Sequence, residues 1–159
     1  MHAQKIEGKF GYTVKLWEGN WHVVASSFKI WTSGKYSNPG NEYSNFKVKN
    51  KKLRFDDMLT FYKGEKKMKL PGKLVQKNPD KLDYIWHGKG LFFWMKSKWK
   101  VVASDADGQW VVLYSTKTAM SPQGMDIMSR RKNMSEKEIK DILSHVDKIY
   151  IKKEPQILK

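Results

Sequence analysis

Apolar and polar residues alternate along most of the first 130 positions, in short runs. The first run, residues 21–31, places an apolar side chain at nearly every second position. Alternation with a period of two is typical of half-buried strands. Similar runs occupy residues 42–49, 53–62, 66–77, 82–87, 98–105, 109–116 and 125–130. The pattern therefore predicts about eight short strands.

Turn-forming residues separate these runs. The segments 50–52, 63–65, 88–90 and 106–108 are all of hairpin length, and three of them contain glycine. No helical pattern lies between the strands, which argues against a parallel α/β sheet. The order predicts an all-β antiparallel meander, either a closed barrel or a sandwich.

The period changes after residue 133. Apolar residues now recur every three or four positions, at Ile139, Ile142, Leu143, Val146 and Ile149. Ser135 and Glu138 have the spacing of a capping box at the start of a helix. We therefore predict a helix over 136–147 that packs on the outside of the strands, followed by a short strand at 149–152.

Length and composition limit the class of protein. We predict a single domain over 1–159, because this length suffices for one substantial core. Cysteine is absent, which excludes disulfides, thiolate metal sites and cysteine nucleophiles. Residues 1–17 contain no apolar core of signal-peptide length. We expect a cytoplasmic protein if this N-terminus is native, and a secreted or cell-envelope protein if it is a processed one.

The chain is strongly basic, with a formal net charge of +15 that comes almost entirely from lysine. Such a surface attracts anions, including nucleic acid and anionic lipid. Scarce arginine argues against base-specific reading of nucleic acid. Trp94 and Trp99 alternate with lysine in 94–100. This segment suits stacking on bases, the rim of a lipid pocket, or contact with an anionic membrane.

Three stretches carry a family resemblance: GNWHVVASS at 19–27, WKVVASDADGQWVVLYS at 99–115, and MDIMSRRKNMSEKEIKDIL at 125–143. In this order they resemble the lipocalins, most closely the bacterial lipocalins, over about residues 19–148. The usual Thr-Asp-Tyr of the second stretch is replaced by Ser104-Asp105-Ala106. The resemblance implies an eight-stranded up-and-down barrel over about 19–130 with one C-terminal helix on its outside.

The resemblance also implies how the barrel closes and what it binds. The Trp of Gly-x-Trp plugs the closed end and an Arg after the last strand packs over it, and Trp21 and Arg130 match these positions. Gly19 lets the chain turn sharply below the barrel. The expected function is binding, transport or scavenging of a small hydrophobic molecule, such as a fatty acid or lysophospholipid, in the lumen.

Strand alternation supplies candidates for the lumen wall, although a one-residue slip would invert the assignment. The candidates are Val23, Ala25, Phe46, Val48, Phe55, Tyr84, Trp86, Val101, Ala103, Asp126 and Met128. Asp126 stands out because it is in phase with Met128 and Arg130. It is either an anchor for a ligand hydroxyl or amine, or a solvated rim residue.

Enzymatic signals are weak. The four histidines have no metal-ligand spacing, and the chain has no Gly-x-Ser-x-Gly elbow and no phosphate-binding loop. The adjacent Asp56 and Asp57 would point to opposite faces of a strand, so they cannot form an acid–base pair. We expect no enzyme, no metal and no cofactor. The alternative to a lipocalin-type carrier is a basic protein with a filled barrel that binds nucleic acid or anionic membrane.

Overall fold

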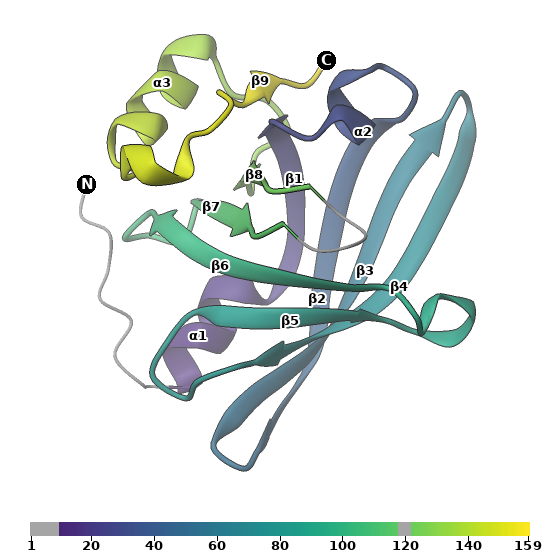
Figure 1. The fold of residues 1–159 in the computed structure, drawn as a ribbon, viewed down its shortest axis with the longest axis vertical. Coiled ribbons are helices and arrows are strands. Elements are labelled where there is room, and N and C mark those ends of the chain that lie inside the picture. Colours follow the sequence, from purple (N-terminus) through teal and green to yellow (C-terminus); the bar gives the residue numbers. More distant parts are fainter. Residues whose placement is uncertain (1–9, 118–121) are drawn as a thin grey trace.

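Eight antiparallel strands form a closed barrel in the computed structural model, which describes residues 10–117 and 122–159 (Figure 1). The strands are β1 (Gly19–Ser26), β2 (Ser37–Lys49), β3 (Lys52–Lys63), β4 (Lys66–Gln76), β5 (Asp83–Gly88), β6 (Lys96–Ser104), β7 (Trp110–Ser115) and β8 (Gly124–Ser129). Each pairs with the next, and β1 closes the barrel by pairing with both β2 and β8. The predicted eight-stranded up-and-down barrel with a C-terminal helix is confirmed.

The two ends of the barrel differ. At one end, here called the floor, α1 (Phe10–Trp17) leads directly into the start of β1. The β2–β3 hairpin turns at this same end (Figure 1). At the other end, here called the mouth, lie α2 (Lys29–Thr32), the β3–β4 turn and the β5–β6 connection, which contains the 3₁₀ helix η1 (Gly90–Phe92).

The C-terminal helix α3 (Glu136–Ser144) packs on the outside of the barrel. Its buried face, which includes Ile139 and Ile142, contacts the outward-facing side chains of β7 and β8, among them Val112 and Ile127. The molecule therefore has two apolar clusters, one inside the barrel and one between the barrel and α3. No helix in the two described ranges is long and apolar enough to cross a membrane.

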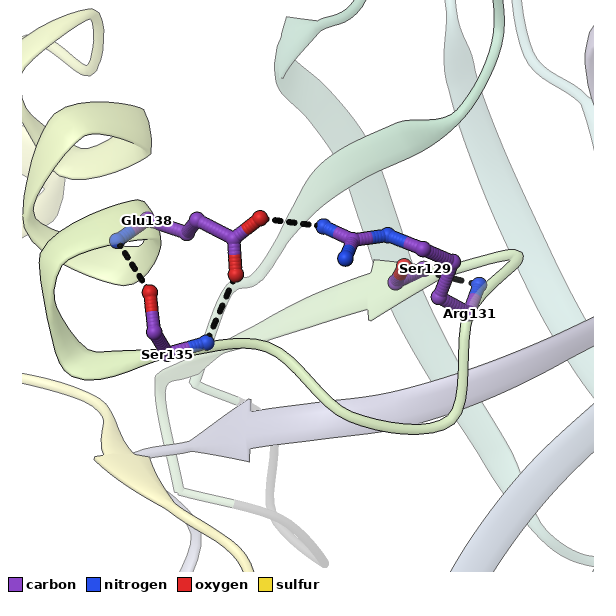
Figure 2. A network of polar contacts seen from close by, with 4 residues as sticks. All are labelled: Ser129, Arg131, Ser135 and Glu138. Carbon is purple, nitrogen blue, oxygen red and sulfur yellow. Dashed lines mark hydrogen bonds and ion pairs between the residues drawn. The ribbon is translucent and has the colours of Figure 1, made fainter.

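The start of α3 has the predicted capping box. The Glu138 amide donates to Ser135 Oγ at 3.1 Å, and the Ser135 amide donates to Glu138 Oε2 at 2.7 Å (Figure 2). The same Glu138 carboxylate accepts from the Arg131 guanidinium, and the Arg131 amide donates to Ser129 Oγ at 3.0 Å. These contacts tie the first turn of α3 to the last residue of β8.

Three features differ from the sequence-based expectations. The run predicted as one strand over 21–31 ends at Ser26, and α2 follows it. The helix predicted to reach 147 ends at Ser144. The tail strand predicted at 149–152 is wrong, because the 3₁₀ helix η2 (Lys148–Tyr150) occupies its first half and no strand follows at 151–152. The Asp147 side chain accepts from the Ile149 amide at 3.1 Å and so caps that turn. The tail does add a strand to β1, but at β9 (Gln156–Ile157).

Candidate ligand-binding site

The floor of the barrel is built around Trp21, which is almost fully buried. Its indole nitrogen donates to the Trp17 carbonyl at 2.9 Å. The Arg130 guanidinium lies over its ring, 3.8 Å from the centroid, and donates to the carbonyls of Asn20 and Leu16 at 3.0 and 2.9 Å. Gly19 has a φ of +97°, which favours glycine. The structure thus brings the three residues assigned to barrel closure into one cluster.

Trp17 seals the floor from inside, and the sequence analysis missed it. Its ring lies 5.2 to 5.8 Å from the rings of Tyr43, Phe55 and Tyr84, and its indole nitrogen donates to the Tyr84 hydroxyl at 3.1 Å. The apolar spacing of Phe10, Val14 and Trp17 is helical and was the available signal. It covers only two turns, which is too short for a firm helix prediction.

A cavity of about 200 Å³ extends from this floor to the mouth. Most of its wall is apolar or aromatic. The wall consists of Trp17, Val23, Phe28, Ile30, Trp31, Asn41, Tyr43, Asp57, Leu59, Leu70, Leu74, Tyr84, Trp86, Met95, Ser97, Trp99, Leu113, Asp126 and Met128. Ile30 of α2 is 50% exposed and still lines the cavity, so the cavity reaches the surface at the mouth.

Two buried carboxyl groups face this cavity from different strands. Asp57 of β3 accepts from the Asn41 amide nitrogen at 2.8 Å. Asp126 of β8 has one oxygen, Oδ1, that is buried without a hydrogen-bond partner among the described residues. Burial raises the pKa of both groups to about 7, and hydrogen bonds from Asn41 and Trp86 at Asp57 and from Ser26 at Asp126 only partly offset it.

The hydroxyl of Tyr43 experiences the charge of both carboxyls. Its pKa lies well above the usual value, first because of burial and then because Asp57 and Asp126 both act on its hydroxyl. Within the parts of the chain that the structure describes, no lysine, arginine or histidine lines the cavity. The two carboxyls are therefore not matched by a basic side chain on the described cavity wall.

The structure brings five of the predicted lumen residues together on the cavity wall: Val23, Tyr84, Trp86, Asp126 and Met128. Three more belong to or pack against the apolar cluster inside the barrel without lining the cavity: Phe46, Phe55 and Val101. Asp57 was missed as a lumen residue. It lies two positions after Phe55 in the same strand, so the alternation already indicated its orientation.

Three lumen assignments are wrong. Ala25 and Ala103 belong to the outer cluster beneath α3. The pairing register shifts between Val23 and Ala25 in β1, and between Val101 and Ala103 in β6. Each irregularity inserts one residue, so the residues after it turn to the other face. Val48 is 52% exposed, because the tip of the β2–β3 hairpin projects beyond the neighbouring strands (Figure 1).

The two tryptophans of 94–100 have different environments. Trp94 is exposed on the β5–β6 connection, together with Leu91 and Phe93. Trp99 lies in β6, lines the cavity, and donates to Ser97 Oγ at 2.7 Å. Trp94 therefore belongs to the exposed connection, whereas Trp99 belongs to the cavity wall.

No group of three or more potential metal ligands is present among residues 10–117 and 122–159.

Comparison with solved structures places the barrel in the lipocalin-like fold. A structure titled "The Siderocalin Ex-FABP functions through dual ligand specificities" aligns with a TM-score of 0.61 and 15% identity, over 90% of this chain and 93% of that chain. A biogenic amine-binding protein aligns with a TM-score of 0.59 and 11% identity, over 97% and 82%. The tryptamine complex of the amine binding protein of Rhodnius prolixus aligns with a TM-score of 0.57 and 11% identity, over 91% and 77%.

These identities are too low to carry more than the fold. No family model and no curated protein sequence matches the chain. The narrower resemblance to bacterial lipocalins therefore stays a prediction.

Proposed function

We propose that this protein binds a small, largely apolar molecule in the barrel lumen and carries or sequesters it. The observation that carries the proposal is the aromatic-walled cavity with a sealed floor and an opening at the mouth. Concave, mostly apolar sites with a few fixed polar groups are typical of small-molecule binding. Two solved structures with the same fold are named as amine-binding proteins, which supports a small-molecule ligand in general.

The cavity favours a compact ligand. Its volume of about 200 Å³ lies below the ~300–1,000 Å³ of most ligand pockets. A fatty acid or lysophospholipid, the ligands that the family resemblance suggests, would have its charged head outside the lumen, because two carboxyls already face the interior. Lys63, Lys66 and Lys67 at the β3–β4 turn are positioned at the mouth to pair with such a head group.

Binding rather than catalysis is part of the proposal. Besides the indole nitrogens of four tryptophans, the polar side chains on the described cavity wall are two carboxyls, an amide, a serine and two tyrosines. Burial raises the pKa of Asp57 and that of Asp126 alike, to about 7, so the two carboxyls do not divide into an acid and a base with separated pKa values. The alternative of a basic protein with a filled barrel is disfavoured because a cavity is present.

Saturation-transfer NMR with indole and 2-phenylethanol tests the proposal. Leu59→Trp adds a large ring to the cavity wall near the mouth, whereas Ile149→Trp adds the same ring to the surface near α3. Saturation transfer should be strong for the parent and for Ile149→Trp and weak for Leu59→Trp. Equal transfer in all three proteins, or none in the parent, would contradict lumen binding.

A second candidate function is docking of the mouth on an anionic membrane. Leu91 and Phe93 are 87% and 77% exposed, and Trp94 lies beside them. The pKa of His87 is lowered by partial burial and by the nearby positive charges of Lys96 and Lys73. Exposed aromatic and aliphatic side chains next to lysines suit an anionic lipid surface. The lysine-rich β2–β3 hairpin lies at the floor and would face away from this surface.

Vesicle sedimentation tests this second function. The protein should sediment with vesicles that contain phosphatidylserine and much less with pure phosphatidylcholine. Phe93→Ser should weaken sedimentation, and Ile149→Ser, which removes an exposed apolar residue elsewhere, should not. Membrane docking fails if the two variants behave alike.

A further inference from the structure

The charge of the cavity wall is unbalanced. Two carboxyls are buried there, and no basic side chain of the described chain shares the wall with them. The Asp57 carboxylate accepts a hydrogen bond from Asn41. Asp126 lines the cavity, and its Oδ1 atom is buried with no hydrogen-bond partner in the residues described. Buried charges in proteins are normally paired, because desolvation of a charge without a partner is strongly unfavourable. A hydrogen-bond donor that carries a positive charge would supply the partner that this carboxylate lacks.

We infer that the lumen selects ligands that carry a protonated amine, with the ammonium group held by Asp126 and Asp57 and the apolar part against the aromatic wall. The inference rests on the proposed function and narrows its ligand class. An ammonium group is small, brings one to three donors and needs acceptors, which the two carboxylates supply.

The surrounding rings add to this selectivity. Tyr43, whose hydroxyl is acted on by both carboxyls, and Trp86, which is near Asp57, both line the cavity. The face of an aromatic ring attracts a cation, and the attraction is stronger when water is excluded. The same wall disfavours an anion, since a third negative charge would lie beside two carboxylates. A cationic ligand should therefore bind most tightly, a neutral ligand less tightly and an anionic ligand least tightly.

Three probes of nearly equal size separate these cases: phenethylamine, 2-phenylethanol and 3-phenylpropanoate. Isothermal titration at pH 8 suits the comparison, because a primary alkylamine, like lysine with its pKa of ~10.4, is still protonated. Both carboxyls, with pKa values of about 7, are then mostly ionised. Phenethylamine should bind at least about tenfold more tightly than 2-phenylethanol, as for one charge-assisted hydrogen bond, and 3-phenylpropanoate should bind least.

Isosteric variants assign the effect to the carboxyls. Asp126→Asn and Asp57→Asn should each weaken phenethylamine binding by about tenfold. The affinity of each variant for 2-phenylethanol should stay within about threefold of the parent's. Asp141→Asn removes the same charge from the exposed surface of α3 and should change neither. If an Asn variant does not fold, the comparison of the three probes on the parent protein still decides.

The outcomes separate this inference from the function on which it rests. Equal binding of phenethylamine and 2-phenylethanol, or unchanged amine affinity in both Asn variants, overturns amine selection but keeps a lumen that binds neutral molecules. Absence of binding by all three probes also overturns it. The indole experiment above then shows whether lumen binding falls as well.

Discussion

The guanidinium carbon of Arg130 lies 3.8 Å from the centroid of the Trp21 ring, although the two residues are 109 positions apart. Arg130 follows the last barrel strand and Trp21 belongs to the first. The contact therefore joins the two ends of the barrel sheet at its floor. The guanidinium also donates to the carbonyl of Leu16, the residue before Trp17 in α1, which holds α1 against the floor.

Trp21→Ala should lower the free energy of unfolding by about 3–5 kcal/mol, as for other buried aromatic side chains. The substitution removes a nearly fully buried ring, the stacking of Arg130 and the hydrogen bond to the Trp17 carbonyl. Urea unfolding monitored by circular dichroism measures the change. Trp94→Ala is the control, because Trp94 is exposed. This substitution should change the free energy of unfolding by no more than about 0.5 kcal/mol. Similar stabilities for the two variants would show that Trp21 does not close the barrel.

The two lumen carboxyls should make the unliganded protein less stable as pH rises. Folding raises the pKa of Asp57 and of Asp126 from 3.8 to about 7, so the folded state holds these protons more tightly than the unfolded state. Their contribution is fully present below about pH 4 and is lost as pH rises through about 7. Each carboxyl changes stability by roughly 1.4 kcal/mol per pH unit between its two pKa values.

The double variant Asp57→Asn/Asp126→Asn isolates this effect. Its stability relative to the parent should increase from pH 4 to about pH 7 and then level off. Tyr43 and Arg130, the charged or titratable groups that act in this region, keep their protonation states over this range. His87 titrates in both proteins and cancels in the difference. A stability difference that does not change with pH would show that these carboxyls are not buried together in the lumen.

Gly72→Ala should disturb the lumen from the strand β4. A Cβ atom at this position would lie 2.4 Å from atoms of the Trp86 indole ring, which lines the cavity. The ring must move, so we expect a loss of about 1–3 kcal/mol in stability and weaker binding of indole. Gly64→Ala does not suit as a control because Gly64 has a positive φ. Thr60→Ala, on the neighbouring strand β3 and outside the cavity wall, is a suitable one. Unchanged indole binding by a folded Gly72→Ala would remove Trp86 from the binding site.

Ser135→Ala should affect stability but not ligand binding. The Ser135 hydroxyl accepts from the Glu138 amide at the start of α3, which lies outside the barrel. Loss of such an N-cap lowers stability by about 1 kcal/mol. Thermal unfolding and the indole experiment measure the two effects separately. A large loss of indole binding would mean that α3 contributes to the lumen, contrary to the separation of the two apolar clusters.

Much of the barrel could be predicted from the alternation of apolar and polar residues, because a strand with one buried face and one solvent-exposed face has a period of two. Tyr84 and Trp86 follow that period and line the cavity. The capping residues Ser135 and Glu138 likewise specify the start of α3 through local hydrogen bonds. Such features depend on residues that are close in sequence, so they can be predicted from one amino-acid sequence.

The remaining features depend on tertiary context. Ala25 and Ala103 lie outside the lumen because irregular pairing shifts the register just before each of them, and nothing local in the sequence marks that shift. Trp17 lies in a helix of eight residues that packing against the floor stabilises. The alternation places Asp57 on the same face as Phe55, but its burial results from closure of the barrel around β3.

Native mass spectrometry of the protein purified from its own host, with organic extraction of bound material, tests the central claim most directly. We predict a discrete additional mass from a compact molecule, present in the parent and in Ile149→Trp and reduced in Leu59→Trp. An unliganded mass, together with no uptake from a panel of fatty acids, lysolipids, arylalkylamines and neutral aromatics, would contradict a ligand-binding lumen.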